Sequence, residues 1–213
     1  EVAEEASRGP VTGFVNCGKI TMRNIGCLLA LTVCLLVKAV PAAGQTPAVA
    51  GAPYVPTPTA IVDRMLTLAE VGPNDYVIDL GSGDGRLVIA AVANYNARGG
   101  MGVEIDRDLV KLATDRAEKA GVASQVSFVA GDLFLADIAR ATVVTLYLLP
   151  TMMKDVEAKL HKELKPGTRV VSHDYPLPSW EPVNVVRFDT PEKIPISGTT
   201  RTVLLLYRVP ARR

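Results

Sequence analysis

Apolar residues between positions 59 and 209 recur with two different periods. Four stretches have apolar residues at helical spacing, and Gly or Pro follows the end of three of them. They predict helices over 61–69, 87–95, 109–120 and 152–164. Short apolar runs predict strands over 76–80, 99–104, 126–130, 142–148 and 168–172. We also expect a short helix between the third and fourth of these strands.

Strands that alternate with helices are typical of an α/β domain with a doubly wound, mostly parallel sheet and helices on both faces. The end of the chain differs, because 183–188 and 202–209 predict two strands joined by the turn-rich stretch 190–200. We expect these two to form an antiparallel pair at one edge of the sheet. Only ten residues separate the fifth strand from Val183, too few for another crossover helix.

The first 58 residues follow neither pattern. Residues 25–37 form an uncharged apolar run of 13 residues with basic residues before it and small residues after it. This order is typical of a secretory signal peptide. As a helix the run is about 20 Å long, which is shorter than a hydrocarbon core of about 30 Å. It could therefore span a membrane only if flanking residues lengthened the helix. A buried amino-terminal helix is the alternative. Met22 would be a natural start, which leaves open whether residues 1–21 are native.

These features divide the chain into an extension with a signal peptide or membrane anchor (1–44), a Pro-rich linker (45–58) and one domain (59–213). We therefore expect the protein to be exported or membrane-associated, and cytosol-facing if the apolar segment is not cleaved.

Charge and cysteine usage exclude several classes of ligand. The net charge is +1, and beyond residue 44 the chain holds 19 basic and 19 acidic side chains, so no strong field favours a nucleic-acid partner. The three cysteines, Cys17, Cys27 and Cys34, all precede the domain, which therefore has no disulfide or thiolate metal site. The two histidines lack metal-ligand spacing, and we expect no metal.

A glycine-rich loop follows the first predicted strand directly. It reads Asp79-Leu-Gly81-Ser82-Gly83-Asp-Gly85, with glycines at i, i+2 and i+4. A dinucleotide loop requires the third glycine at i+5, which here is Arg86, and no Gly-Lys-Ser/Thr follows to make a P-loop. Glu104 and Asp132 stand at the ends of the next two predicted strands, and carboxylates there can accept hydrogen bonds from ligand O–H or N–H groups.

This loop and the two acids together resemble the class I S-adenosyl-L-methionine (SAM) methyltransferases, which have a Rossmann-like fold. The resemblance implies that Asp79, Gly81, Ser82, Gly83 and Gly85 wrap the methionine part of SAM. It also implies that Glu104 binds the ribose hydroxyls and Asp132 the adenine amino group. The alternative is that these are ordinary turn glycines and loop acids.

Further motifs resemble a narrower group. Pro-Tyr-Val-Pro (53–56), Leu-Tyr-Leu-Leu-Pro (146–150) and Ser-His-Asp-Tyr-Pro-Leu-Pro-Ser-Trp (172–180) look like bacterial SAM-dependent methyltransferases. That group is similar to the mitochondrial protein-lysine methyltransferases acting on the adenine nucleotide translocase and on ATP synthase subunit c. The resemblance implies methyl transfer to a protein lysine. Transfer to a small molecule or lipid is an alternative, as is a non-catalytic SAM-fold binding protein of the cell envelope.

Five residues near the expected ligand edge could serve the acceptor. Tyr147, His173 and Asp174 are candidate catalytic residues, and Tyr54, Tyr147 and Tyr175 are candidate substrate contacts. A lysine amine must be neutral to attack, so a proton acceptor or a desolvated channel would help. Tyr147 and His173 could instead be packing residues.

Overall fold

The computed structural model describes residues 54–211. The extension, the apolar segment 25–37 and most of the linker lie outside these residues, so the predictions about them stay predictions. Within the described part, no helix has the length and apolar character needed to cross a membrane.

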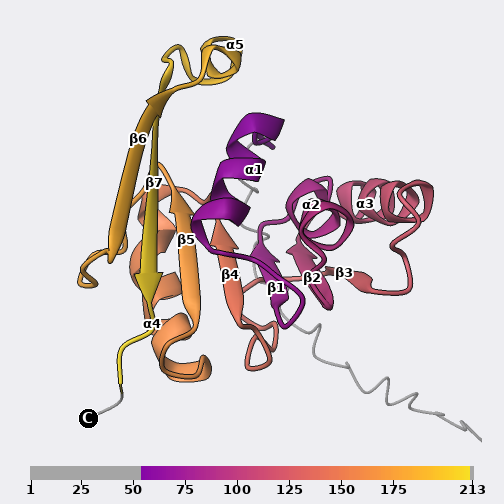
Figure 1. Cartoon of the computed structure of the whole chain (residues 1–213), viewed down its shortest axis with the longest axis horizontal. Coiled ribbons are helices and arrows are strands. Elements are labelled where there is room, and N and C mark those ends of the chain that lie inside the picture. Colours follow the sequence, from indigo (N-terminus) through magenta and orange to yellow (C-terminus); the bar gives the residue numbers. More distant parts are fainter. Residues whose placement is uncertain (1–53, 212–213) are drawn as a thin grey trace, which may run out of the picture. The chain divides into compact units, whose positions relative to one another are not determined.

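One seven-stranded sheet organises the described residues, with strand order β3-β2-β1-β4-β5-β7-β6 (Figure 1). Its strands are β1 (Tyr76–Leu80), β2 (Gly99–Glu104), β3 (Val126–Ala130), β4 (Val143–Leu146), β5 (Arg169–His173), β6 (Asn184–Asp189) and β7 (Arg201–Arg208). The helices are α1 (Thr59–Leu68), α2 (Arg86–Tyr95), α3 (Arg107–Lys119), η1 (Pro150–Met152), α4 (Met153–Glu163), η2 (Pro191–Lys193) and α5 (Ile194–Ser197). The strands β1 to β5 pair in parallel, which confirms the expected doubly wound sheet.

Two apolar cores cover the two faces of the sheet. Successive side chains of a strand point to opposite faces, so Ile78 joins the core under α4 while Val77 joins the core under α1 and α2. All five residues of β1 are buried, as a central parallel strand requires. The buried strands therefore fix the positions at which the loops of the sheet begin and end.

The edge predicted to bind a ligand is where the parallel strands end. Residues Gly81, Ile105, Gly131, Tyr147 and Asp174 each directly follow one of the five parallel strands, so their loops gather along one edge of the sheet.

The predicted antiparallel pair is confirmed, and it has a consequence for this edge. β7 lies between β5 and β6 and is antiparallel to both. Its register pairs Leu204 with His173 and Arg201 with Asp189. The hairpin tip, residues 190–200, therefore extends beyond the end of β5 on the ligand side, where Figure 1 shows α5.

One predicted element is wrong: no helix forms between β3 and β4. The side chains of Asp132 and Asp137 accept hydrogen bonds from the backbone N–H groups of Phe134 and Ala139. Such Asx turns compete with helix formation, because they use the donors of a first helical turn. The connection is a series of turns instead.

The ten-residue connection from β5 to β6 also has no helix. Its side chains Tyr175, Leu177 and Trp180 pack against the core on the α4 face. The Tyr207 hydroxyl in β7 accepts a hydrogen bond from the N–H of Leu177 at 3.1 Å, and Glu157 in α4 binds Ser179. The ten-residue connection is too short for a crossover helix, and its packed side chains cover this part of the sheet instead.

Candidate active site

The glycine loop between β1 and α2 has a backbone that only glycine adopts easily. Gly81, Gly83 and Gly85 have φ of 80°, 52° and 78°. A Cβ on Gly83 would lie 2.5 Å from the Tyr54 ring, and one on Gly81 would lie 2.8 Å from the Leu148 side chain. The glycines therefore allow the side chains of Tyr54 and Leu148 to pack directly against the loop backbone.

Glu104, at the end of β2, is oriented by the loop before any ligand binds. Its Oε2 accepts from the N–H of Gly83 at 2.8 Å, and its Oε1 accepts from the N–H of Asp106 at 3.0 Å. Each carboxylate oxygen has two lone pairs, so each retains one for a further donor. A pair of neighbouring ribose hydroxyls is a donor pair that fits this acceptor.

Asp79 is the buried carboxyl at the end of β1. Burial raises its pKa to about 7, while a hydrogen bond from the Thr145 hydroxyl at 2.7 Å opposes that rise. The nearby carboxylates Glu104 and Asp84 raise the pKa further. A cationic group bound beside Asp79 would favour its ionised form.

Two more residues of the predicted cofactor set have free hydrogen-bonding capacity. Ser82 is buried within the loop, and its Oγ has no hydrogen-bond partner among the described residues. Asp132, after β3, is exposed; its Oδ1 accepts from the N–H of Phe134 at 2.8 Å. The Ser82 hydroxyl packs against Gly102 of β2, so it supports the loop from below. The pre-oriented carboxylate of Glu104 and the exposed acid Asp132, each at the end of a strand, fit the ribose and adenine parts of SAM.

Tyr54 and Arg86 join the linker to the glycine loop. The ring of Tyr54 lies over Gly83, and Arg86 donates to the Thr57 carbonyl at 2.7 Å. Arg86 also makes a two-point contact with Asp84, through Nε to Oδ1 at 2.8 Å and Nη2 to Oδ2 at 2.6 Å, and Arg116 pairs with the same carboxylate. Residues 54–58 thus form a strap, held over the loop by Arg86.

The predicted acceptor residues come together at the ends of β4 and β5. The ring of Tyr147 stacks on His173, with centroids 4.0 Å apart, and lies nearly parallel to Tyr175 at 6.5 Å. His173 is 1% exposed, and neither of its ring nitrogens has a hydrogen-bond partner among the described residues. Its Nε2 lies 3.5 Å from Oδ2 of Asp174, too poorly placed for a hydrogen bond.

Two titratable groups of this cluster, His173 and Tyr147, are uncharged at physiological pH. Burial lowers the pKa of His173 to about 4, with Asp174 raising it and Lys193 lowering it. Burial, with the charge of Asp174 and the neighbouring Tyr175, raises the pKa of Tyr147 to about 12. The cluster therefore offers an uncharged imidazole and a phenol beside one carboxylate.

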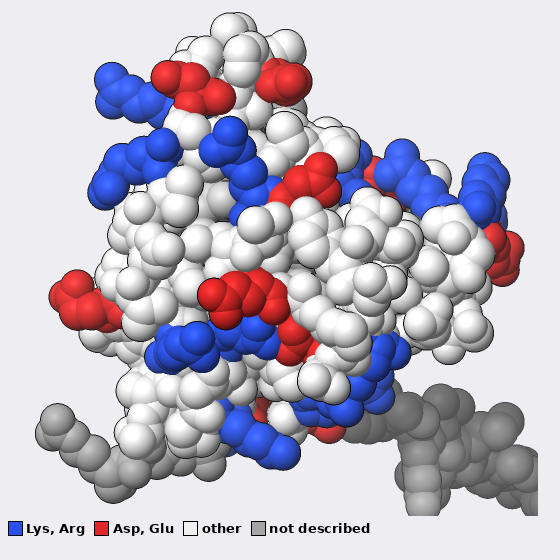
Figure 2. All heavy atoms as spheres, in the orientation of Figure 1, with Lys and Arg blue, Asp and Glu red and all other residues white. Residues whose placement is uncertain are grey.

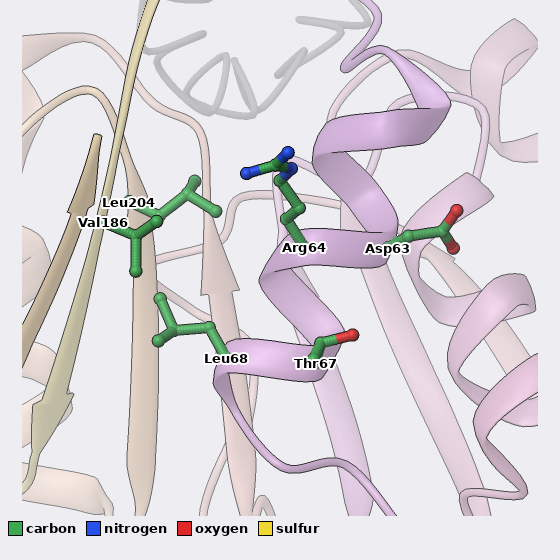
Figure 3. Close-up of a pocket in the computed structure, with 6 residues that line it drawn as sticks. All are labelled: Asp63, Arg64, Thr67, Leu68, Val186 and Leu204. Atoms are coloured by element: carbon green, nitrogen blue, oxygen red, sulfur yellow. The ribbon is translucent and has the colours of Figure 1, made fainter. Parts of the chain in front are cut away.

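A second hollow lies away from these loops. A groove of about 290 Å³ runs between α1 and the β6–β7 hairpin, lined by Asp63, Arg64, Thr67, Leu68, Val186 and Leu204 (Figure 3). None of these residues belongs to the loops at the ends of the parallel strands, and the guanidinium of Arg64 lies 4.0 Å from the centre of the Phe188 ring. We do not assign the groove to the cofactor site.

A doubly wound sheet with a Gly-x-Gly-x-Gly loop after β1, a pre-oriented Glu after β2 and an Asp after β3 defines a class I SAM-dependent methyltransferase. A family model described as the ANTKMT methyltransferase domain matches residues 79–184. A protein-lysine N-methyltransferase of Saccharolobus islandicus (strain REY15A) is 46% identical over 137 residues, 64% of this chain and 85% of that relative. The chain belongs to this methyltransferase family.

Other relatives agree on the fold and differ in their described acceptors. The adenine nucleotide translocase lysine N-methyltransferase of Mus musculus is 40% identical over 63% of this chain, and the match spans 58% of the mouse protein. The crystal structure of an RNA methyltransferase from Salinibacter ruber with S-adenosyl-L-homocysteine is 47% identical, with a TM-score of 0.67, over 75% of this chain and 96% of that one. A Thiobacillus denitrificans methyltransferase with the same ligand, at 16% identity and TM-score 0.58, shows the fold. SAM is the cofactor of this enzyme.

Sequence reasoning did not identify two residues at the site. Arg86 was visible only as a departure from the dinucleotide motif, and its contact with the Thr57 carbonyl depends on the path of the linker. Lys193 stands in a turn-rich stretch with no motif, yet its ammonium reaches Asp174. Only the folded geometry brings these two residues to the site.

Proposed function

We propose that this enzyme transfers a methyl group from SAM to the side-chain amine of a protein lysine. The observation that carries the proposal is the stacked Tyr147–His173–Tyr175 ring cluster at the ends of β4 and β5, beside the glycine loop. The relatives from Saccharolobus islandicus and Mus musculus, both described as lysine N-methyltransferases, support the same acceptor.

The cluster matches the chemical needs of an amine acceptor. A lysine arrives as an ammonium, which the faces of tyrosine rings attract, and it must lose a proton before its nitrogen can attack. The proton is released to water before the neutral amine enters the cluster. The imidazole of His173 is uncharged and buried, so it supports the Tyr147 ring without placing a positive charge beside the amine. SAM supplies a methyl group already activated by its positive sulfur, and positioning the amine is the main remaining task.

An RNA acceptor is the second candidate, because the similar Salinibacter ruber protein is described as an RNA methyltransferase. Beyond residue 44 the chain has equal numbers of basic and acidic side chains. On the face seen in Figure 2, blue and red side chains are interspersed among white ones and form no continuous basic track. Phosphate backbones require such a track for affinity, which favours the protein acceptor.

We further propose that residues 25–37 associate the enzyme with a membrane, which would bring it close to a membrane-embedded acceptor. The support is the uncharged 13-residue run with basic residues on its amino-terminal side. A lipid or small membrane molecule is then the remaining alternative acceptor.

Partition of a labelled methyl group distinguishes these acceptors. The full chain is incubated with methyl-labelled SAM and a membrane-containing extract, and the label is followed into protease-sensitive, RNase-sensitive and solvent-extractable fractions. We expect label in the protease-sensitive fraction alone, and none with the Glu104→Ala variant. Label in RNA or lipid would overturn the lysine proposal.

A further inference from the structure

A buried lysine anchors the hairpin tip to the acceptor cluster. The side chain of Lys193, in η2, is 3% exposed. Its Nζ donates to Oδ2 of Asp174 at 2.5 Å and to the carbonyl of Arg201 at 2.6 Å. Burying an ammonium is costly unless it is paired and hydrogen-bonded, so both partners are needed to keep Lys193 there.

Asp174, the partner of Lys193, is itself fixed in an unusual conformation. Its φ is 64°, a left-handed value that is uncommon outside glycine and that aspartate adopts more readily than most residues when its side chain is hydrogen-bonded locally. Its N–H donates to the Val203 carbonyl at 2.7 Å, and its Oδ1 accepts from the Val203 N–H at 3.0 Å. The carboxylate is therefore held on one oxygen by β7 and on the other by the hairpin tip.

His173 stands next in this series of contacts. The oxygen that binds Lys193 is the one that lies 3.5 Å from Nε2 of His173, and the Tyr147 ring stacks on a face of the same imidazole. Lys193 thus neutralises the carboxylate that faces the imidazole.

The hairpin tip also reaches the cofactor side of the site. Glu192, next to Lys193, lines a groove of about 360 Å³ together with Pro56, Pro58 and Arg86, which belong to the strap and to the start of α2. The tip therefore contacts the acceptor cluster through Lys193 and borders the strap through Glu192.

We propose that Lys193 is a positioning residue of the acceptor half of the active site: through Asp174 it fixes the imidazole of His173 against Tyr147 and makes the hairpin tip part of that half. The role in catalysis rests on the proposed transfer to lysine. The arrangement of the three residues does not depend on the identity of the acceptor.

The surrounding charges give the proposal a measurable consequence. The charged groups that act on His173 are Asp174, from its own loop, and Lys193, from the hairpin tip. Tyr147, which follows β4, is an uncharged phenol, because its pKa is raised to about 12. The charged residues of α1 have other partners: Asp63 lies at the Tyr95 hydroxyl, and Arg64 lies over the Phe188 ring. Without Lys193, the charge of Asp174 is unopposed and raises the pKa of His173.

Histidine NMR tests this directly, because the chain has only two histidines. In a His161→Gln background, the remaining ring signal of the full chain reports His173 alone. We expect no titration of this signal between pH 5.5 and 8. With Lys193→Met added, we expect titration within that range, and with Lys193→Met and Asp174→Asn together, a return to the original behaviour.

Activity and binding complete the test. Lys193→Met should slow lysine methylation at least tenfold at pH 6, and the rate should recover in part at pH 8.5. The affinity of this variant for SAM should stay within twofold of wild type. Lys193→Arg should restore part of the methylation rate. Lys165→Met, at an exposed site, is the matched control. If Lys193→Met does not fold, Lys193→Gln, which keeps a hydrogen-bond donor for Asp174, takes its place.

The outcomes separate the two proposals. An unchanged His173 titration in Lys193→Met, or a wild-type methylation rate, would overturn the role of Lys193. A shifted titration with no lysine product from the wild-type chain would overturn the proposed function and leave the arrangement of Lys193, Asp174 and His173 intact.

Discussion

Glu104 has its binding geometry before the cofactor arrives. Two backbone N–H groups, from Gly83 and Asp106, hold its two carboxylate oxygens at 2.8 and 3.0 Å. Binding therefore loses little side-chain entropy at this residue, and the remaining lone pairs face a ligand with fixed directions. Such preorganisation makes the residue a sensitive place to test the cofactor site.

Replacing Glu104 should weaken SAM binding without unfolding the domain. Glu104→Ala removes the acceptors that we assign to two ribose hydroxyls. Hydrogen bonds to a charged group contribute about 1.5–3 kcal/mol each, so the affinity should fall by about 100-fold or more. Titration calorimetry with SAM and S-adenosylhomocysteine measures the change. Glu118→Ala, at an exposed site in α3, is the control. An affinity within twofold of wild type would show that Glu104 does not bind the ribose.

The buried Asp79 carboxyl should lower the free energy of unfolding of the ligand-free protein at neutral pH. Its pKa is raised from 3.8 to about 7, so the native state holds its proton to higher pH than the unfolded state. The stabilisation present below about pH 4 is therefore lost as pH rises to about 7. Asp79→Asn should raise the free energy of unfolding by about 2 kcal/mol at pH 8 and by much less at pH 4.5, while weakening SAM binding by about tenfold.

Urea unfolding at the two pH values, without ligand, measures this difference. Asp155→Asn, an exposed acid in α4, should show no such pH-dependent gain. An equal effect of Asp79→Asn at both pH values would contradict the raised pKa.

At the scale of elements, the strap over the glycine loop should respond to Arg86. Arg86→Met removes the donor to the Thr57 carbonyl, although Asp84 keeps Arg116 as a partner. Hydrogen exchange of residues 54–58 should become faster, and SAM affinity should fall about five- to tenfold, because one hydrogen bond of about 1 kcal/mol no longer holds the strap. Arg98→Met, exposed, serves as control. Unchanged exchange in the strap would refute the role of Arg86.

The helix-free connection from β5 to β6 should depend on Trp180. This ring packs in the core under α4 and meets Tyr207 edge-on at 6.5 Å. Trp180→Ala should lower the free energy of unfolding by about 2–4 kcal/mol, as for other large-to-small core changes, and leave SAM affinity unchanged. Leu135→Ala, at a site 86% exposed, should change stability by less than about 0.5 kcal/mol. A loss for Trp180→Ala no larger than this control would contradict the packing role.

Elements with strong periodicity were predictable, and elements set by long-range contacts were not. The first three strands were predicted with their observed bounds, because each is a short stretch with apolar residues between turn residues. Burial differs among them: β1 is fully buried, whereas β3, at the edge of the sheet, is partly exposed. The helix expected between β3 and β4 was wrong, because Asp132 and Asp137 use their side chains to make turns. The insertion of β7 between β5 and β6 could not be predicted, since sequence order does not determine strand order in the sheet.

The residues of the candidate site likewise divide into those that the sequence pattern predicts and those that only long-range contacts bring together. Glu104 and Asp132 could be predicted because each lies where a strand ends, and parallel strands bring their ends to one edge. The pairing of Lys193 with Asp174 could not, because it depends on how far the hairpin tip bends back toward β5.

At the scale of the whole molecule, a neutral body and a family of lysine methyltransferases point to a protein acceptor. The body offers no net field to draw in a polyanion. We propose that recognition of the acceptor depends instead on local contacts around Tyr147, Tyr175 and the hairpin tip. We propose that the amino-terminal apolar run contributes by bringing the enzyme to a membrane.

Mass spectrometry of the acceptor tests the central claim most directly. The full chain is incubated with isotope-labelled SAM and membrane protein, and peptides are sequenced to locate the label. We predict labelled methyl groups on lysine side-chain nitrogen, absent with Glu104→Ala and strongly reduced with His173→Asn. Label on any other residue type, or protein without label while SAM is consumed, would contradict the account.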